Sequence, residues 1–274
     1  MKENNLFFGE KLDIDQEKIC FETLGCLIDA GYLSEADIKG CRSYRDYYRL
    51  SEAVRDRVIG EMMDRGVRFL STDGVILSPF AKIGEGTLIQ PGTQIRHGVG
   101  IGTNCDIGPN SIIEDSEIGD GCTVNATQIY SSKLDNNVKI GPFCHIRPNS
   151  HLCDGVKIGD FVEVKNSVVG KNTHASHLTY IGDSDVGERV NFGCGTVCVN
   201  YNGYSKNRCV IGDDAFIGCN TNLVAPVTVG EKGYTAAGST ITDDVPSGAL
   251  AIARARQVNK EGRAEALKDK YKKK

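Results

Sequence analysis

Residues 83–113 read IGEGTLIQPGTQIRHGVGIGTNCDIGPNSII and place an isoleucine at every sixth position. These positions are Ile83, Ile89, Ile95, Ile101, Ile107 and Ile113. A helix repeats every 3.6 residues and a strand every 2, so neither explains a step of six that continues through the whole stretch. The step predicts a solenoid in which each hexad is one short strand followed by one corner.

The same step returns twice further along the chain. It is found at Ile140, Ile146, Leu152, Ile158 and Val164, and again at Ile211, Ile217, Leu223 and Val229. Three hexads make a coil of about eighteen residues whose aliphatic side chains point inward, and stacked coils bury a continuous column at roughly 1.5–3 kcal/mol per side chain. We therefore expect a mainly β protein, a parallel β-helix of hexapeptide repeats.

Glycine follows many of the ladder residues. The positions are Gly84, Gly102, Gly108, Gly141, Gly159, Gly182, Gly212, Gly218 and Gly230. Because glycine adopts positive φ freely, we interpret these glycines as the corners at which the backbone turns.

Composition agrees with a narrow interior and limits the compartment. The chain of 274 residues has 32 glycines, no tryptophan and 7% aromatic residues. No apolar run approaches the roughly 20 residues that span a bilayer, and the start, MKENNLFFGEKLD, lacks the apolar core of a signal peptide. We expect a cytoplasmic protein without a membrane partner. The net charge of −4 gives no reason to expect a nucleic-acid partner.

The eleven cysteines show no paired spacing and no CxxC motif, so we expect reduced, buried thiols.

Three regions are expected along the chain. Residues 1–70 lack the step of six and form a helical cap, with one helix near residues 19–28, a capping box from Ser34 to Asp37, and a third helix from Ser51 that Gly66 ends. Residues 71–248 form the β-helix. Residues 249–274 form a C-terminal strand and a basic tail, since residues 254–274 hold nine Lys/Arg and three Asp/Glu.

Residues 140–207 carry most of the candidate chemistry. Arg147 and Lys165 are eighteen residues apart, so they should lie on one face in neighbouring coils, and an anion between them would relieve their repulsion. This spacing suggests a phosphate site, although both cations could instead point into solvent. His177 is a candidate base, because an imidazole can accept a proton at neutral pH. At residues 200–207 an insert, NYNGYSKN, interrupts the repeat and places Lys206 at its expected tip, either to close over a site or as a solvated loop.

The stretches FVEVK, HLTYIGD, VNFGCGT, NYNG, IGDDAFIG, LVAPVTVG and AAGSTIT resemble the acetyltransferase domain of the bacterial bifunctional enzyme that acetylates glucosamine-1-phosphate and then uridylates it. The resemblance runs from about residue 51 to residue 260. It implies a left-handed parallel β-helix, a homotrimer with sites shared between subunits, acetyl-CoA as co-substrate, and synthesis of UDP-N-acetylglucosamine and cell-wall precursors.

The resemblance also implies roles for single residues. His177 would be the general base, and the backbone N–H of Cys194 would stabilise the oxyanion. Five residues would hold the sugar phosphate: Arg147, Lys165, Tyr180, Asn191 and Lys206. Five others would lie near the acetyl transfer point or line the acetyl-CoA site: Asn200, Tyr201, Cys219, Ala237 and Arg254.

This chain departs from the family pattern in three places. Cys194 and Cys219 stand where the family commonly has alanine and serine, so small size is preserved. A thiol beside an acetyl thioester opens the alternative of an acyl-cysteine intermediate, but the resemblance implies direct transfer. Residues 1–70 hold no Gly-rich phosphate loop of a nucleotide-binding domain, so uridyltransferase activity is expected to be absent.

Three alternative functions remain open. The first is an acyltransferase that acts on a different amine, and the second is a catalytically inactive scaffold. The third is a zinc hydratase, for which the candidate ligands are His145, His151, His174 and His177. His145 and His151 are one hexad apart and should lie on different faces, so we expect no metal.

Overall fold

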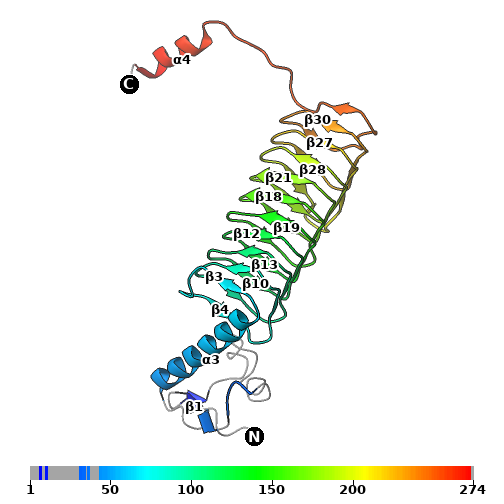
Figure 1. The fold of residues 1–274 in the computed structure, drawn as a ribbon. Helices are drawn as coiled ribbons and strands as arrows, with labels where there is room; N and C mark the ends of the chain where they lie inside the picture. The colour runs from blue at the N-terminus through cyan, green and yellow to red at the C-terminus, as the bar shows by residue number, and fades with distance from the viewer. Residues whose placement is uncertain (1–5, 8–9, 12–30, 35, 38–42, 273–274) are drawn as a thin grey trace.

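The structure, a computed structural model, describes residues 6–7, 10–11, 31–34, 36–37 and 43–272. Short strands wind around a common axis, and each turn of the chain adds one strand to each of three parallel sheets (Figure 1). This is the parallel β-solenoid that the step of six predicts. The left-handed sense of the coil stays a prediction.

The three sheets, here called faces 1, 2 and 3, have 11, 10 and 9 strands. Face 1 consists of β3 (Arg68–Phe69), β6 (Leu88–Ile89), β9 (Asp106–Ile107), β12 (Thr123–Val124), β15 (Lys139–Ile140), β18 (Lys157–Asp160), β21 (His174–His177), β24 (Asn191–Phe192), β27 (Phe216–Ile217), β30 (Tyr234–Thr235) and β32 (Leu250–Ala251). Face 2 consists of β4 (Ile76–Leu77), β7 (Gln94–Ile95), β10 (Ile112–Glu114), β13 (Gln128–Tyr130), β16 (His145–Ile146), β19 (Glu163–Lys165), β22 (Tyr180–Gly182), β25 (Val197–Val199), β28 (Asn222–Val224) and β31 (Thr240–Ile241). Face 3 consists of β5 (Lys82–Ile83), β8 (Gly100–Ile101), β11 (Glu117–Ile118), β14 (Lys133–Leu134), β17 (His151–Leu152), β20 (Val168–Val169), β23 (Ser184–Val186), β26 (Cys209–Ile211) and β29 (Val227–Val229).

The chain runs from face 1 to face 2 to face 3 and back to face 1. We call the bend between faces 1 and 2 the first corner, and the bend between faces 2 and 3 the second corner. Residues about eighteen apart therefore lie one above the other in neighbouring coils.

The ladder residues form the core, as the sequence predicts. Ile89, Ile95, Ile107 and Ile113 have no exposed surface, and the later ladder residues are buried in the same column. Ile83, in an early coil, is only half-buried. The interior is therefore a one-dimensional stack of branched aliphatic side chains.

Positive φ explains only two of the corner glycines, so the predicted reason for glycine at these positions is wrong for most of them. Of the nine glycines that follow a ladder residue, only Gly108 and Gly141 have positive φ. The others are small because the next coil packs directly on them: a Cβ on Gly84 would lie 2.6 Å from the backbone of Gly102. In regular coils the left-handed residue comes three positions after the ladder residue, and it is glycine at Gly86 but asparagine at Asn104.

Helix α3 (Tyr44–Asp64) precedes the coils and lies against the first of them (Figure 1). Its Val54, Val58 and Met62 are buried in the same apolar cluster as the first coil. The helix begins seven residues before the predicted start at Ser51, because the side chain of Ser43 accepts a hydrogen bond from the N–H of Asp46 and caps it. The predicted stop is confirmed, since Gly66 follows the helix with φ of +87°.

Little of the remaining N-terminal region is described. Strands β1 (Leu6–Phe7) and β2 (Glu10–Lys11) pair antiparallel. The capping box is confirmed, because the Ser34 N–H donates to Asp37 Oδ2 at 2.8 Å and the Asp37 N–H donates to Ser34 Oγ at 3.2 Å. The helix predicted near residues 19–28 lies outside the described residues.

At the other end, β32 supplies the expected C-terminal strand, and residues 252–272 are exposed throughout. The basic tail contains an unexpected helix, α4 (Arg263–Lys272), which buries no residue and lies away from the coils (Figure 1).

Among the described parts of the chain, none of the helices is both long and apolar enough to cross a membrane.

The described cysteines are unpaired, but they are not all buried. Cys153 and Cys194 are half-buried and Cys219 is exposed, because these three follow a strand at a corner rather than pointing into the column.

Candidate active site

Arg147 and Lys165 lie side by side on face 2, where it meets the second corner. The strands pair Ile146 with Val164, and the Arg147 N–H donates to the Val164 carbonyl at 2.8 Å. The eighteen-residue spacing therefore places the two cations in neighbouring coils on one face, as predicted.

The cations do not need an outside anion to lie close together. Arg147 Nη1 is 2.7 Å from Glu163 Oε1, and Lys165 Nζ is 3.5 Å from Asp183 Oδ2. Carboxylates of the same chain already balance both charges, so repulsion between the two cations is no evidence for a bound anion. Any anion that bound here would meet an ordered, partly neutralised pair of cations.

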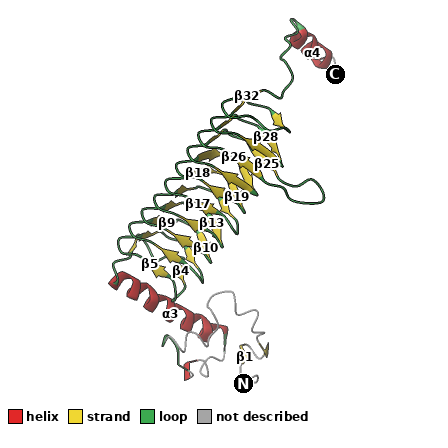
Figure 2. Cartoon of the chain, turned by 90° about the vertical axis from the view of Figure 1, so that its right-hand side faces the viewer, coloured by secondary structure: helices red, strands yellow, loops and turns green. Residues whose placement is uncertain are grey.

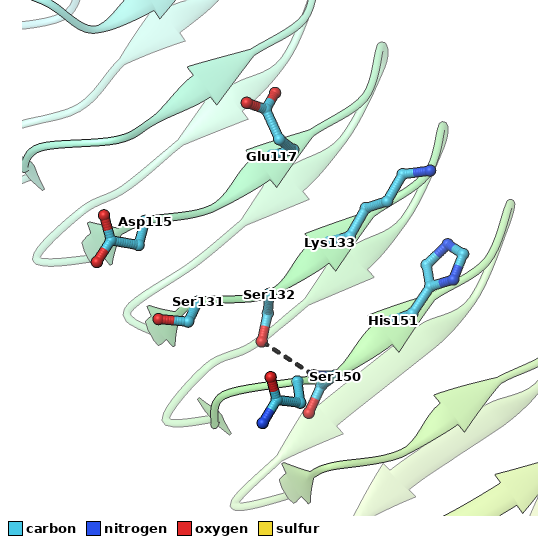
Figure 3. A pocket seen from close by; sticks show the side chains of 8 residues that line it. Asp115, Glu117, Ser131, Ser132, Lys133, Ser150 and His151 are labelled. Carbon is cyan, nitrogen blue, oxygen red and sulfur yellow. Dashed lines mark hydrogen bonds between the residues drawn. The ribbon is translucent and has the colours of Figure 1, made fainter.

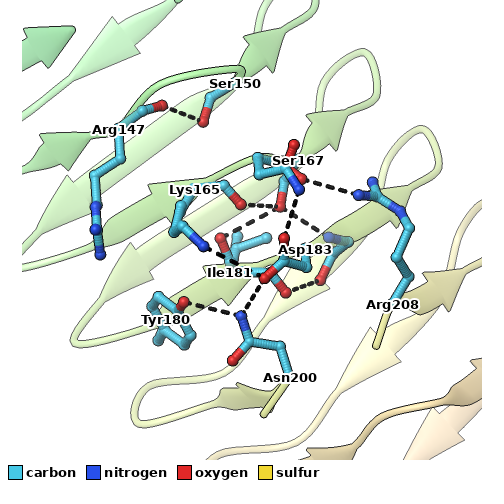
Figure 4. Close-up of polar contacts among 12 residues, drawn as sticks. Arg147, Ser150, Lys165, Ser167, Tyr180, Ile181, Asp183, Asn200 and Arg208 are labelled. Carbon is cyan, nitrogen blue, oxygen red and sulfur yellow. Dashed lines mark hydrogen bonds and ion pairs between the residues drawn. The ribbon is translucent and has the colours of Figure 1, made fainter. Parts of the chain in front are cut away.

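Asp183 is the centre of this group, and the sequence reasoning missed it. Its carboxylate accepts hydrogen bonds from the side-chain amides of Asn166 and Asn200 and pairs with Lys165 (Figure 4). The Asp183 side chain is 6% exposed and that of Lys165 is 17% exposed. We call Lys165, Asn166, Tyr180, Asp183 and Asn200 the Asp183 cluster. The sequence does hold a signal for Asp183, because it lies one coil after Asn166 and residues one coil apart stack on each other.

Several interactions hold the ionised form of Asp183. Burial raises the pKa of this carboxyl, but hydrogen bonds from Asn166 and Asn200, together with the charge and hydrogen bond of Lys165, outweigh burial and lower the pKa below its usual value. Asp183 is therefore an anion at neutral pH and keeps Lys165 in place.

Tyr180 joins the cluster from the start of β22. Its hydroxyl accepts a hydrogen bond from Asn200 Nδ2 at 3.1 Å. The ring lies over Gly182, where a Cβ would collide with the phenol group. Gly182 thus lets the tyrosine lie flat along face 2 and bring its hydroxyl to the amide of Asn200.

His177 lies elsewhere, at the end of β21 on the first corner. Its strand partner in the preceding coil is Asp160, and its side chain is exposed. Cys194, Cys219 and Ala237 continue the same column in the next three coils. The Gly195 N–H donates to the Leu178 carbonyl at 3.1 Å, the Asn220 N–H to Cys194 at 2.8 Å, and the Gly238 N–H to Cys219 at 2.8 Å. We call His177, Cys194, Cys219 and Ala237 the His177 column.

Within the described residues, the backbone N–H of Cys194 donates no hydrogen bond. It lies one coil from His177, so it is free to donate to a group bound beside that imidazole.

The remaining candidates are spread over three places. Asn191 lies on face 1, in register with His174. Arg254 lies beside the His177 column, since a Cβ on Gly238 would be 3.8 Å from its Cδ. Tyr201 and Lys206 form an antiparallel bridge at the base of the insert, so Lys206 is not at the tip as predicted. The insert extends away from the coils beside β25 (Figure 2).

The structure therefore brings together Arg147, Lys165, Tyr180 and Asn200 on face 2, and His177, Cys194, Cys219 and Ala237 at the first corner. The two groups lie at opposite ends of the face 2 strands, one at the first corner and the other at the second. The zinc-hydratase set is separated, because His145 lies on face 2, His151 on face 3, and His174 and His177 on face 1.

The coils define the chain as a hexapeptide-repeat β-solenoid protein. The family model described as "Bacterial transferase hexapeptide (six repeats)" matches residues 80–115 and 131–166. A solved structure of an Arabidopsis UDP-N-acetylglucosamine acyltransferase superimposes with a TM-score of 0.58 at 18% identity, covering 66% of this chain and 70% of that chain. That similarity supports the fold.

The resemblance noted in the sequence is confirmed by two relatives, both named "Bifunctional protein GlmU". The protein of Caldicellulosiruptor saccharolyticus is 50% identical over 235 residues, which are 86% of this chain and 51% of that protein. The protein of Thermoanaerobacter pseudethanolicus is 48% identical over 259 residues, which are 94% of this chain and 56% of that protein. The chain thus spans about half the length of the curated relatives it matches.

Proposed function

We propose that this chain transfers the acetyl group of acetyl-CoA to the 2-amino group of glucosamine-1-phosphate. The observation that carries the proposal is the buried Asp183 carboxylate, which fixes Lys165 and Asn200 beside Arg147 and Tyr180. An ordered set of cations and hydrogen-bond donors on one face suits a phosphorylated sugar. The 50% identity to a bifunctional GlmU protein supports the same activity.

In the proposed reaction, the amine attacks the thioester carbonyl and His177 removes a proton from the nitrogen. The tetrahedral oxyanion accepts a hydrogen bond from the Cys194 N–H. The carbon–sulfur bond then breaks, and the CoA thiolate takes the proton from His177 to leave as free thiol. Cys219, Ala237 and Arg254 extend the His177 column toward the C-terminal coil, and they would line the path of the CoA chain.

The proposed active form is a homotrimer in which neighbouring chains complete each site. Three exposed apolar side chains, Phe143, Phe161 and Leu178, follow one another at the first corner, and we call them the apolar ridge. Their φ values of 59°, 57° and 44° are unfavourable for bulky residues and cost of order 1 kcal/mol each. Such residues are better explained by a partner that covers them than by solvent. The ridge lies beside His177, so a partner there could bring Asn191, Tyr201 or Lys206 to a neighbour's site.

We also assign the protein to the cytoplasm. Its described cysteines are unpaired, which suits a reducing compartment, and acetyl-CoA is available there. The expected place in metabolism is the supply of N-acetylglucosamine-1-phosphate for UDP-N-acetylglucosamine and peptidoglycan synthesis. We propose that this chain performs acetylation and not uridyl transfer.

The test is release of free CoA thiol by the purified chain with acetyl-CoA and an acceptor. Thiol release with glucosamine-1-phosphate, but not with glucosamine, is the expected result, because only the phosphate engages Arg147 and Lys165. Faster release with another amine of the acceptor panel would instead assign the chain to a different acyltransfer. A parallel reaction with UTP and N-acetylglucosamine-1-phosphate should yield no UDP-sugar.

A further inference from the structure

A second cluster of chemically active side chains lies on face 3, away from the proposed acetyl transfer groups. It consists of Asp135, His151 and Cys153. Leu134 pairs with Leu152, so Asp135 and Cys153, each one residue further on, lie opposite each other in neighbouring coils. His151 is two residues before Cys153 on the same strand path and points to the same side. Figure 3 shows His151 on this outer surface beside Lys133.

The ligand atoms of the three side chains converge. One carboxylate oxygen, one imidazole nitrogen and the thiol sulfur all lie within 4.8 Å of one another. Asp135 Oδ2 is 3.0 Å from His151 Nε2. That nitrogen is buried, and the Asp135 carboxylate is the group that faces it among the described residues.

The surroundings leave room for an ion. In the register of face 3, Gly119 precedes Asp135 and Gly170 follows Cys153, so neither of these two positions places a side chain over the pair. Asp135 and His151 keep 23% and 35% of their side-chain surface exposed, which gives access from solvent. Lys133 Nζ is 3.2 Å from Asp135 Oδ1, so it contacts the other carboxylate oxygen and competes only through its charge.

We propose that Asp135, His151 and Cys153 form a binding site for one zinc-like divalent transition-metal ion. A carboxylate oxygen, an imidazole nitrogen and a thiolate sulfur are all zinc ligands, whereas magnesium and calcium prefer oxygen alone. With bonds of about 2.0–2.3 Å in tetrahedral geometry, ligand atoms stand roughly 3.3–3.6 Å apart, so small side-chain rotations close the site. The Cys153 thiol loses its proton to solvent as the sulfur–metal bond forms, and water occupies the fourth position.

The four histidines considered from the sequence do not converge, and this metal site uses one of them together with two other residue types. The set consists of His151, a cysteine two residues later and an aspartate from the preceding coil. It can be recognised only once the register between the coils is known. The ion would join β14 to β17 across one coil boundary. This inference is independent of the proposed acetyl transfer.

The test uses the full chain, stripped of metal and titrated with Co²⁺. We expect a sulfur-to-cobalt charge-transfer band in the wild-type protein that Cys153→Ser removes. Asp135→Asn and His151→Gln should weaken cobalt affinity at least tenfold. Lys133→Gln should tighten it several-fold, because a competing positive charge is gone. His145→Gln, which removes an outward histidine on face 2, is the matched control and should bind like wild type.

Two outcomes overturn the proposal. One is an equal charge-transfer band in wild type and Cys153→Ser, which would assign the sulfur ligand to a cysteine other than Cys153. The other is a cobalt affinity that neither Asp135→Asn nor Lys133→Gln changes. Circular dichroism of each variant establishes that it is folded, and Zn²⁺ should raise the melting temperature of wild type but not of Cys153→Ser.

Discussion

Asp183 holds several side chains of the proposed acceptor site through one buried carboxylate. Each partner comes from a different position along the chain: Lys165 and Asn166 from the preceding coil, and Asn200 from the next. Lysine carries three N–H donors, so one can contact Asp183 while the others remain for a phosphate. The sequence could suggest Lys165 as a cation on the right face. It could not show that a neighbouring carboxylate, rather than the ligand, fixes its position.

Replacing Asp183 with asparagine should destabilise the protein by about 1–3 kcal/mol at pH 7. Lys165 loses its ionic partner, and the new side-chain amide brings an N–H donor up against the amide donors of Asn166 and Asn200. The pKa of Asp183 is lowered in the folded state, so its contribution is present above the ordinary value near 4 and is lost as pH falls through the folded value. Urea unfolding at several pH values should therefore show a shallower acid dependence in the variant below about pH 4. An identical acid dependence in both proteins would contradict the role given to Asp183.

Replacing His177 with alanine should lower kcat by roughly 10²–10⁴ if the imidazole is the general base. The side chain is exposed, so the free energy of unfolding should change by less than about 0.5 kcal/mol. Steady-state thiol release and urea unfolding measure the two quantities. His97→Gln removes another outer histidine in an early coil and serves as the control. Unchanged turnover in His177→Ala would remove the general-base role.

At the scale of elements, the spacing between coils is set by the residue that follows each buried aliphatic. The step of six predicted this element well, because it repeats without a miss from Ile83 to Ile113. Helix α3 was predicted less well at its start, because Ser43 and Ser51 both precede helix-forming residues and only the three-dimensional cap distinguishes them. The predicted position of Lys206 at the tip of the insert was wrong for a similar reason. Lys206 pairs with Tyr201 in an antiparallel bridge at the base of the insert, and composition does not reveal such a bridge.

Two glycine-to-alanine changes separate close packing from ordinary helix propensity. Gly84→Ala should destabilise by about 1–3 kcal/mol, because its Cβ would lie 2.6 Å from the backbone of Gly102 and force the coils apart. Gly60→Ala, inside α3 with nothing within 4 Å of the added Cβ, should stabilise by about 0.5–1 kcal/mol. Urea unfolding of both variants measures these changes. A neutral Gly84→Ala would show that the coils can separate at no cost.

Considered as a whole molecule, the chain is a long prism whose two groups of candidate residues lie at different corners. Repeat spacing predicts which residues stack, so it placed Arg147 above Lys165 correctly. It does not predict association, because residues from a second chain have no fixed spacing from those of the first. The apolar ridge is one feature of the described chain that bears on association.

Changing Phe161 to asparagine should affect the assembly far more than the single chain. Asparagine accepts left-handed φ more readily, but the variant also loses the stacking of the Phe161 ring on Phe143, so the stability of each chain should change by no more than about 1 kcal/mol. Loss of the apolar side chain from the ridge should at the same time weaken the proposed trimer and lower the proposed acetyl transfer. Light scattering across a dilution series reports the mass. Leu70→Asn, an exposed leucine at the far end of the coils, is the control, and a Phe161→Asn trimer as tight as wild type would contradict the assignment.

The two ends of the prism are finished differently, and this difference gives the molecule a direction. Helix α3 buries Val58 and Met62 over the first coil, whereas residues 252–272 bury nothing over the last. Since each turn is supported only by its neighbours, fraying should start at the bare terminus and proceed inward. Amide hydrogen exchange should consequently be fastest around β30 to β32 and slowest midway along the axis. Ala237 and Arg254 belong to the turns expected to open most readily. A long, thin ligand bound across them would therefore stabilise the C-terminal end of the coils.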